Sequence, residues 1–212
     1  MINTVSRTIL CLAVSCILAM SVQAETFKEG VDYKVAKTPG RVEDPAKIEV
    51  REFFWYGCPH CYKLEPYVET WLKTKPDDVN FVRTPGMMNR SWELHGKAFF
   101  AARSLGILEQ SHRNLFDAIH RDKRNLNSQK ALAGFYADYG IDKKVFNKAF
   151  ESFGVTSEVR QADALSRAYR LMGVPALIVN GKYITNGRMS KDYNRWMRIV
   201  DHLVELERKN NK

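Results

Sequence analysis

The chain has 212 residues, of which 45% are hydrophobic and 27% are charged. These values are typical of a globular protein with a packed core and exclude a fibrous or intrinsically disordered chain. The formal net charge is +9, but the basic residues are scattered, with one modest cluster at residues 121–124. Because no aromatic interleaving or groove-reading motif accompanies that cluster, it favours a solvated helix end, and we expect no nucleic-acid partner.

The first 24 residues differ in character from the rest of the chain. A short start containing Arg7 precedes an apolar run over residues 9–20, and small residues then lead to Ala24. This order is typical of a secretory signal peptide that is cleaved after Ala24. A membrane anchor would need about 20 apolar residues, and this run is shorter. Lipidation at Cys16 is disfavoured because the apolar run continues beyond it. We therefore expect residues 1–24 to be removed on export.

Removal of the signal peptide leaves a single pair of cysteines. Cys11 and Cys16 lie in the leader, whereas Cys58 and Cys61 remain, with only two residues between them. A structural disulfide stabilises a protein mainly by closing a long loop of the unfolded chain, and this pair would close a very short one. In an oxidising compartment, such a pair points to redox chemistry instead.

The first predicted unit combines a strand, a helix and a second strand. Residues 48–56 are rich in β-branched and aromatic side chains, which indicates a buried central strand. The motif Cys58-Pro59-His60-Cys61 follows directly. A helix is expected over residues 59–73, with Pro59 at a favoured first-turn position and a kink at Pro66. Residues 79–84 read as the next strand, and a parallel crossover of this kind is right-handed.

From residue 91 to about residue 152 the pattern is wholly helical. Ser128 is a predicted N-cap, and Gly140 with the following Ile141-Asp142 predicts the end of one helix and the start of the next. The helical spacing then predicts a core stripe made of Val145, Phe146, Ala149, Phe150 and Phe153. A further helix is predicted from the spacing of Val159, Ala162, Leu165, Tyr169 and Met172.

The sheet resumes near the C-terminus. Short strands are predicted over residues 175–179 and 182–185, joined by Asn180-Gly181, a strong hairpin signal. An amphipathic helix is expected over residues 191–207. The length fits one domain with an insertion. The predicted fold class is therefore α/β, with an inserted all-helical domain. The expected divisions are 1–24 signal peptide, 25–84 first part of the α/β domain, 85–152 helical insertion and 153–212 second part.

The predicted position of Cys58, at the start of a helix, suits the chemistry of a reactive thiol. A thiolate attacks disulfides, whereas a thiol does not. Cys58 lies where a strand gives way to a helix, so free backbone N–H groups and the positive end of the helix dipole face its sulfur. His60 can add a donor or a positive charge. Stabilising the thiolate makes the disulfide a stronger oxidant. Cys61, one turn later, is expected to be buried and to act as the resolving thiol.

Other uses of this cysteine spacing are disfavoured. Structural zinc sites take four ligands, and no second cysteine pair is present, so no metal is expected. Haem attachment requires His after the second cysteine, where this chain has Tyr62. The redox interpretation remains the favoured one, with the Cys58–Cys61 disulfide itself as the redox group and no further cofactor.

The sequence contains the motifs Glu52-Phe53-Phe54, Cys58-Pro59-His60-Cys61-Tyr62, Gly173-Val174-Pro175-Ala176 and Val179-Asn180-Gly181-Lys182-Tyr183. These motifs resemble those of the DsbA family of periplasmic disulfide oxidases, and the similarity extends from about Phe27 to the last helix. The resemblance implies a thioredoxin fold interrupted by a helical domain, a low pKa for Cys58, and periplasmic localisation. It also implies donation of disulfides to unfolded or partly folded exported proteins, with reoxidation by a DsbB-like membrane quinone reductase.

The resemblance also assigns roles outside the cysteine motif. Pro175 at the start of a strand is usually an edge device, but the family has a cis proline here that faces the cysteines. The Val174 backbone would then be free to pair with an extended substrate. Glu52 on the buried strand is costly unless it titrates or is paired, and by resemblance it helps to move the proton of Cys61. Arg83 falls where the family usually has Lys and cannot give up its proton in the same way.

The remaining candidates are less specific. Met87, Met88 and Trp92 are expected to flank the site, where flexible methionines suit a surface that accepts many chains; ordinary packing fits equally well. His95, His112, His120 and His202 show no ligand spacing and are expected to be surface or cap residues.

Rival functions are a disulfide isomerase or reductase and a holdase-like binding module on the same fold. Isomerases of this superfamily carry an N-terminal dimerisation domain, whereas only residues 25–43 precede the first core strand. We therefore expect a monomer.

Overall fold

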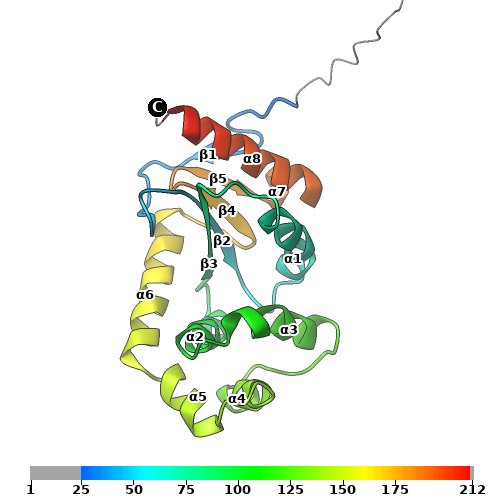
Figure 1. Cartoon of the computed structure of the whole chain (residues 1–212), viewed down its shortest axis with the longest axis vertical. Coiled ribbons are helices and arrows are strands. Elements are labelled where there is room, and N and C mark those ends of the chain that lie inside the picture. The colour runs from blue at the N-terminus through cyan, green and yellow to red at the C-terminus, as the bar shows by residue number, and fades with distance from the viewer. Residues whose placement is uncertain (1–24, 211–212) are drawn as a thin grey trace, which may run out of the picture.

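A computed structural model describes residues 25–210 and is shown in Figure 1. The predicted signal peptide, residues 1–24, lies outside the described residues. Within residues 25–210, no helix combines the length and the apolar character needed to cross a bilayer.

The sheet has five strands in the order β1-β5-β4-β2-β3. β2 and β3 are parallel, as predicted, whereas β4 runs antiparallel to both β2 and β5. β2 is buried along its whole length. The two-residue strand β1 was not predicted, because it is too short to show an alternating pattern. The strands are β1 (Lys34–Val35), β2 (Ile48–Phe54), β3 (Val79–Pro85), β4 (Ala176–Val179) and β5 (Tyr183–Asn186).

Helices cover the sheet and build a second, wholly helical half of the molecule (Figure 1). α1 and α8 contribute to one apolar core with β2, while Tyr169 at the end of α6 packs with Phe53 in another. α6 runs along one side, from the helical half to the sheet. The helices are α1 (Pro59–Leu72), α2 (Arg90–Ser104), α3 (Leu108–His120), α4 (Gln129–Ala137), α5 (Lys143–Phe150), α6 (Phe153–Ala168), α7 (Gly187–Ser190) and α8 (Tyr193–Asn210).

The predicted core stripe at α5 and α6 was partly wrong. Phe146 and Phe150 are buried, but the side chains of Val145 and Phe153 are 48% and 84% exposed. α5 has only eight residues, and the chain turns at the Ser152 N-cap before α6 begins at Phe153. The stripe therefore does not continue along one helix face.

The end of α6 also departs from the prediction. Met172, expected on the buried face of this helix, is 96% exposed. α6 ends at Ala168, and Arg170 has a φ of +51°, a left-handed conformation that takes the chain out of the helix. Met172 thus lies in the loop that leads to β4.

The predicted turn signals are confirmed. Asn180 and Gly181 both have positive φ in the hairpin between β4 and β5, as a tight hairpin turn of this type requires. A Cβ atom on Gly181 would lie 2.3 Å from the carbonyl oxygen of Gly40, so only glycine fits there. Ser128 caps α4 by accepting a hydrogen bond from the backbone N–H of Ala131.

One edge of the sheet brings the functional motifs together. β2 ends at Phe54, which pairs with Pro85 at the end of β3. Phe53 pairs with Ala176, the first residue of β4. The cysteine motif after β2, the loop after β3 and the Val174-Pro175 turn before β4 therefore emerge at the same edge, beside the helical half.

Candidate active site

Cys58 occupies the N-cap of α1. Pro59 begins the helix, where its missing N–H costs nothing. The sulfur of Cys58 accepts a hydrogen bond from the backbone N–H of Cys61 at 3.4 Å. The side chain of Cys58 is 7% exposed, whereas that of Cys61 is fully buried. The two sulfurs are not bonded to each other, so the structure describes the dithiol form.

The two thiols differ in acidity. The pKa of Cys58 is lowered to about 7 by a hydrogen bond from the Cys61 thiol; burial opposes this, and the backbone N–H groups of Cys61 and His60 reinforce it. Burial, followed by the interaction with Cys58, raises the pKa of Cys61 well above its usual value. His60 reaches the sulfur through its backbone N–H, and its side chain is exposed. The arrangement therefore suits Cys58 as the nucleophile and Cys61 as a protonated, buried partner.

The Val174-Pro175 turn lies against the cysteine motif. Its peptide bond is cis, as the resemblance implied. The Cys58 thiol donates to the carbonyl oxygen of Val174 at 3.5 Å. Gly86, just after β3, packs closely behind this turn: a Cβ atom there would lie 3.2 Å from Val174 Cγ1 and 3.0 Å from the ring of Trp92. Small size at Gly86 therefore allows this close approach.

The apolar flank contains residues of differing exposure. Trp92 stacks on Trp55, with ring centroids 4.9 Å apart and an interplanar angle of 11°. Met87 packs against the helical core, and a Cβ atom on Gly96 would meet its methyl group at 2.3 Å. Met88 is exposed. The stacked tryptophans are half-buried, and Trp92 lies near Gly86 beside the Val174-Pro175 turn, while Met87 serves packing.

Two buried carboxyl groups share one arginine beneath the cysteines. Arg83 Nη2 donates to Glu65 Oε2 at 3.1 Å, and Arg83 Nε lies 3.6 Å from Glu52 Oε2. Glu52 and Glu65 are fully buried. Burial, together with the charge of Glu65, raises the pKa of Glu52 to about 8, against the lowering effect of Arg83. Arg83 thus pairs with both carboxyl groups.

The expectation that the histidines lie at the surface or at caps was wrong for His95 and His112, which are 2% and 5% exposed. Tyr56 Oη lies 2.8 Å from His112 Nδ1, and His112 Nε2 lies 3.4 Å from Glu65 Oε1. A carboxylate can only accept, so we assign the proton to Nε2, with Tyr56 donating to Nδ1. His112 is buried because it lies on the face of α3 that packs against the helical core.

His120 also contacts the active-site segment. Its Nε2–H donates to the carbonyl oxygen of Tyr56 at 2.7 Å, and its ring stacks on Tyr62 with centroids 4.8 Å apart. His120 is the last residue of α3. His202 is half-buried and its ring lies against that of Phe27. Two histidines of α3, His112 and His120, thus hold the side chain and the backbone of Tyr56.

Sequence reasoning did not select Glu65, His112 or Tyr56. One signal was present: Glu65 lies four residues after Cys61, so both lie on the same face of α1. A carboxyl group on a buried helical face requires a partner. The histidine that serves as that partner lies in α3, and no spacing in the sequence connects the two.

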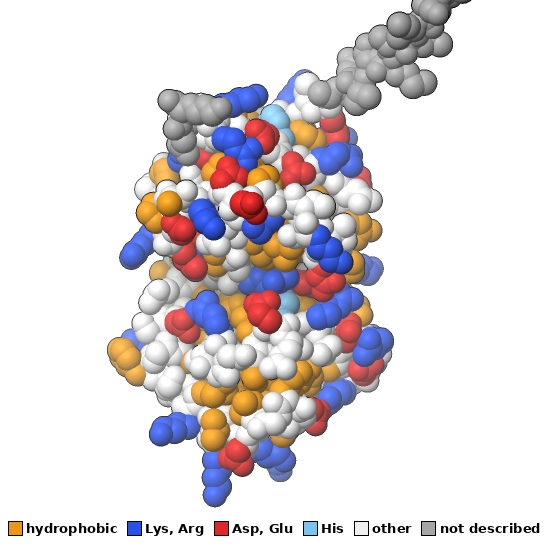
Figure 2. All heavy atoms as spheres, viewed as in Figure 1, with side chains coloured by type: hydrophobic (Ala, Val, Ile, Leu, Met, Phe, Trp, Pro, Cys, Tyr) orange, Lys and Arg blue, Asp and Glu red, His pale blue; other side chains and the backbone are white. Residues whose placement is uncertain are grey.

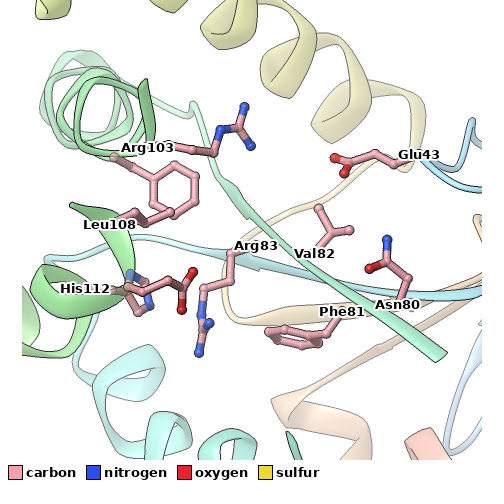
Figure 3. A pocket seen from close by; sticks show the side chains of 10 residues that line it. Glu43, Asn80, Phe81, Val82, Arg83, Arg103, Leu108 and His112 are labelled. Carbon is pink, nitrogen blue, oxygen red and sulfur yellow. The ribbon is translucent and has the colours of Figure 1, made fainter. Parts of the chain in front are cut away.

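A cavity of about 190 Å³ opens beside this buried network rather than over the cysteines, which do not line it. Figure 3 shows Arg83 from β3 and His112 from α3 near each other at one side of it. Across the described part of the chain, no group of three or more potential metal ligands occurs. On the face in Figure 2, acidic and basic side chains are interspersed. The surface view therefore agrees with the scattered charge of the sequence.

Comparisons with known proteins agree with this geometry. A profile of the DSBA-like thioredoxin domain matches residues 78–203. The chain is 36% identical to the thiol:disulfide interchange protein DsbA of Pseudomonas aeruginosa over 93% of both chains. It is 39% identical to the DsbA of Azotobacter vinelandii, over 93% of this chain and 94% of that one.

Comparison with solved structures also finds DsbA proteins and confirms the predicted fold class. The crystal structure of P. aeruginosa DsbA superposes with a TM-score of 0.83 at 36% identity, covering 87% of this chain and 96% of that one. DsbA from Xylella fastidiosa gives 0.78 at 32% identity, covering 84% and 96%.

Proposed function

The chain belongs to the DsbA family of thiol:disulfide interchange proteins and is a thiol:disulfide oxidoreductase, and on that premise we propose that it is a dithiol oxidase. It transfers the Cys58–Cys61 disulfide to newly exported proteins. The observation that carries the proposal is the difference between the two thiols. Cys58 is held at a helix N-cap with a pKa of about 7, while the pKa of buried Cys61 is raised.

The transfer takes place in two exchange steps. A substrate thiolate attacks the sulfur of Cys58, the Cys58–Cys61 bond breaks, and Cys61 leaves as a thiolate that takes up a proton. A second substrate thiolate then attacks the substrate sulfur of the mixed disulfide and expels Cys58 as a thiolate. The substrate loses two electrons and gains a disulfide, while the enzyme becomes the dithiol. A stabilised Cys58 thiolate makes the second step favourable.

The substrate is proposed to bind as an extended segment at the Val174-Pro175 turn. The Cys58 sulfur lies 3.5 Å from the Val174 carbonyl oxygen, so a chain paired with this backbone would carry its own cysteine to the nucleophile. Pro59 begins the helix whose N-terminus faces the sulfur, and the backbone N–H of His60 supports the thiolate. Glu52 is proposed to deliver the proton to Cys61, since its raised pKa keeps a proton available near neutral pH.

The proposed partners and location follow from the family. Clients are unfolded or partly folded exported proteins, met in the periplasm after cleavage near Ala24. A DsbB-like membrane quinone reductase restores the disulfide, and the enzyme acts as a monomer without a further cofactor. We place the helical insertion at residues 85–152, between the two parts of the thioredoxin domain at 25–84 and 153–212.

Trapping of the intermediate tests the function. The oxidised enzyme should oxidise a reduced, unfolded client in stoichiometric amounts, and Cys58→Ser should abolish this. In a Cys61→Ser variant loaded as a mixed disulfide at Cys58 with a small thiol, a client thiolate should attack the Cys58 sulfur and expel the small thiol, and the variant should accumulate as a Cys58–client adduct. Activity that requires the reduced enzyme would instead indicate an isomerase or reductase. Full biological activity of the double serine variant would indicate a holdase.

A further inference from the structure

The buried carboxyl pair is asymmetric in its hydrogen bonds. Glu65 receives two donors, His112 Nε2–H at one oxygen and Arg83 Nη2 at the other, at 3.4 and 3.1 Å. Neither oxygen of Glu52 accepts a hydrogen bond from any described residue, and its ion contact with Arg83 is 3.6 Å long. One cation therefore serves two carboxyl groups, and the histidine contacts only one of them.

We propose that His112 is a positioning residue that directs the single negative charge of this pair onto Glu65 and so keeps Glu52 protonated for Cys61. The inference rests on the proposed oxidase function and on the proton role of Glu52 within it. It adds a residue of the helical half, from α3, to the machinery of the thioredoxin half.

Hydrogen bonding decides which carboxyl group is charged. A buried carboxylate without donors is strongly disfavoured, whereas donors to its oxygens favour the charged form. With one positive charge on Arg83, one carboxylate leaves the buried group neutral overall, and a second would leave it negative. The donors select Glu65 for that charge, so the remaining proton stays on Glu52.

His112 acts as an oriented neutral donor. Burial, reinforced by the charge of Arg83, lowers its pKa, so the imidazole is neutral at neutral pH. Burial also raises the pKa of Tyr56 well above its usual value, so that hydroxyl keeps its proton and donates a hydrogen bond to Nδ1. This leaves the N–H of His112 at Nε2, directed at Glu65. Tyr56 thereby fixes the tautomer that the proposal requires.

The electrostatics agree with this assignment. Burial alone would raise the pKa of Glu65, but the hydrogen bond from His112, the positive charge of His112 in its protonated form, and the charge of Arg83 outweigh burial and lower the pKa. The cavity adjoins the two donors of Glu65, since Arg83 and His112 line it, whereas neither Glu52 nor Glu65 does (Figure 3). The charged or titratable groups that act on the carboxyl pair and on His112 are Arg83 from β3, Glu109 and His112 from α3, Tyr56, Cys58 and Cys61.

Loss of His112 should leave one proton on the carboxyl pair but distribute it between Glu52 and Glu65. Without its donor, Glu65 competes for the proton, and Glu52 becomes an anion in part of the population. Because the charges of Glu52 and Cys58 interact, that anion disfavours the Cys58 thiolate. The pKa of Cys58 in the reduced enzyme thus reports where the proton lies.

The experiment compares three variants by titrating the Cys58 thiolate through its ultraviolet absorbance. We expect His112→Leu to raise the pKa of Cys58 by about half a unit or more, and His112→Gln, which keeps a donor and an acceptor, to restore it. The double variant His112→Leu, Glu52→Gln should lose the rise, because no charge can then form at position 52. A rise that persists in the double variant would mean a packing effect, and no rise in His112→Leu would overturn the proposal.

A second measurement uses the wild-type protein in case His112→Leu does not fold. Carbon-13 NMR of the glutamate-labelled wild-type protein at pH 7 should show one buried protonated carboxyl group, and through-bond correlation to its own backbone should assign that group to Glu52. If the protonated carboxyl group is instead assigned to Glu65, the assignment of charge is wrong. Client oxidation that depends on Cys58 would still stand in that case, so this inference and the oxidase function fail separately.

Discussion

The sulfur of Cys58 lies 3.5 Å from the carbonyl oxygen of Val174, although the two residues are 116 positions apart in the chain. The contact exists because β2 and β4 are antiparallel neighbours, so the end of one strand lies beside the start of the other. The predicted nucleophile thus lies against the stretch of backbone that we propose binds an extended substrate. The predictions below follow from this contact and from the charges beneath it.

The acidity of Cys58 should make the stability of the reduced enzyme depend on pH. Its pKa is lowered from 9.0 to about 7 in the folded state. For a lowered acid pKa, the stabilisation is fully present above the unfolded value and is lost as the pH falls through the folded value. Relative to Cys58→Ser, the reduced enzyme should therefore gain about 2 kcal/mol between pH 6 and pH 9.

Urea unfolding of both reduced proteins across this pH range measures that gain, and the serine variant serves as the reference for all other titrating groups. A constant difference between the two proteins would show that Cys58 titrates like an ordinary cysteine.

Replacing Glu52 with Gln should slow the enzyme while leaving the fold intact. Gln has nearly the same shape but carries no transferable proton, so Cys61 should take up its proton more slowly. The pKa of Glu52 is raised from 4.5 to about 8 in the folded state. Glu52 therefore lowers the free energy of unfolding as the pH rises between those two values, because the unfolded chain gives up this proton more readily than the folded one. The variant should therefore be more stable than wild type near pH 8. Stopped-flow oxidation and urea unfolding measure the two effects, and unchanged kinetics would reject the proton role.

Arg83 should matter for stability as well as for catalysis. It is the cation shared by Glu52 and Glu65, and its side chain is only 15% exposed. Removing one partner of a buried ion pair typically costs about 3–5 kcal/mol. We expect Arg83→Met to approach that loss at pH 7.

Arg83→Lys is the matched control, because it keeps the charge but cannot contact two carboxyl groups with a planar fork. Its stability should lie between those of wild type and Arg83→Met in urea unfolding. Equal stability of the Met variant and wild type would mean that the arginine does not hold the carboxyl pair.

A methyl group at Gly86 should disturb substrate binding more than the fold. It would lie 3.2 Å from Val174 and 3.0 Å from the ring of Trp92, so the Val174-Pro175 turn or the ring must move by a few tenths of an ångström. We expect Gly86→Ala to slow oxidation of a polypeptide client several-fold while oxidation of a small dithiol changes less. Gly134→Ala in α4, where a Cβ atom meets nothing within 4 Å, is the control and should leave both rates unchanged. Equal slowing of both substrates by Gly86→Ala would locate the effect at the cysteines rather than at the turn.

The elements with strong local signals were predicted closely. Neighbouring residues encode β2, the helix that starts at Pro59 and the Asn180-Gly181 hairpin: β-branched side chains, a proline at the first helical position, and two residues that accept positive φ. The errors at Phe153 and Met172 arose where one helix gave way to another segment, since a periodic pattern does not show that the chain has turned.

The sequence by itself predicted a redox-active cysteine pair, because two cysteines with two residues between them, placed where a strand gives way to a helix, are badly placed for a structural disulfide and well placed for a reactive thiol. Only the tertiary structure decided which groups surround that thiol. From the sequence, His112 was expected at the surface or at a cap and Glu65 was not selected, because helical spacing does not show which helix faces meet in the folded chain. The meeting of α1, α3 and β3 selects Arg83 and His112 as the donors of Glu65 and leaves Glu52 without a hydrogen bond from any described residue.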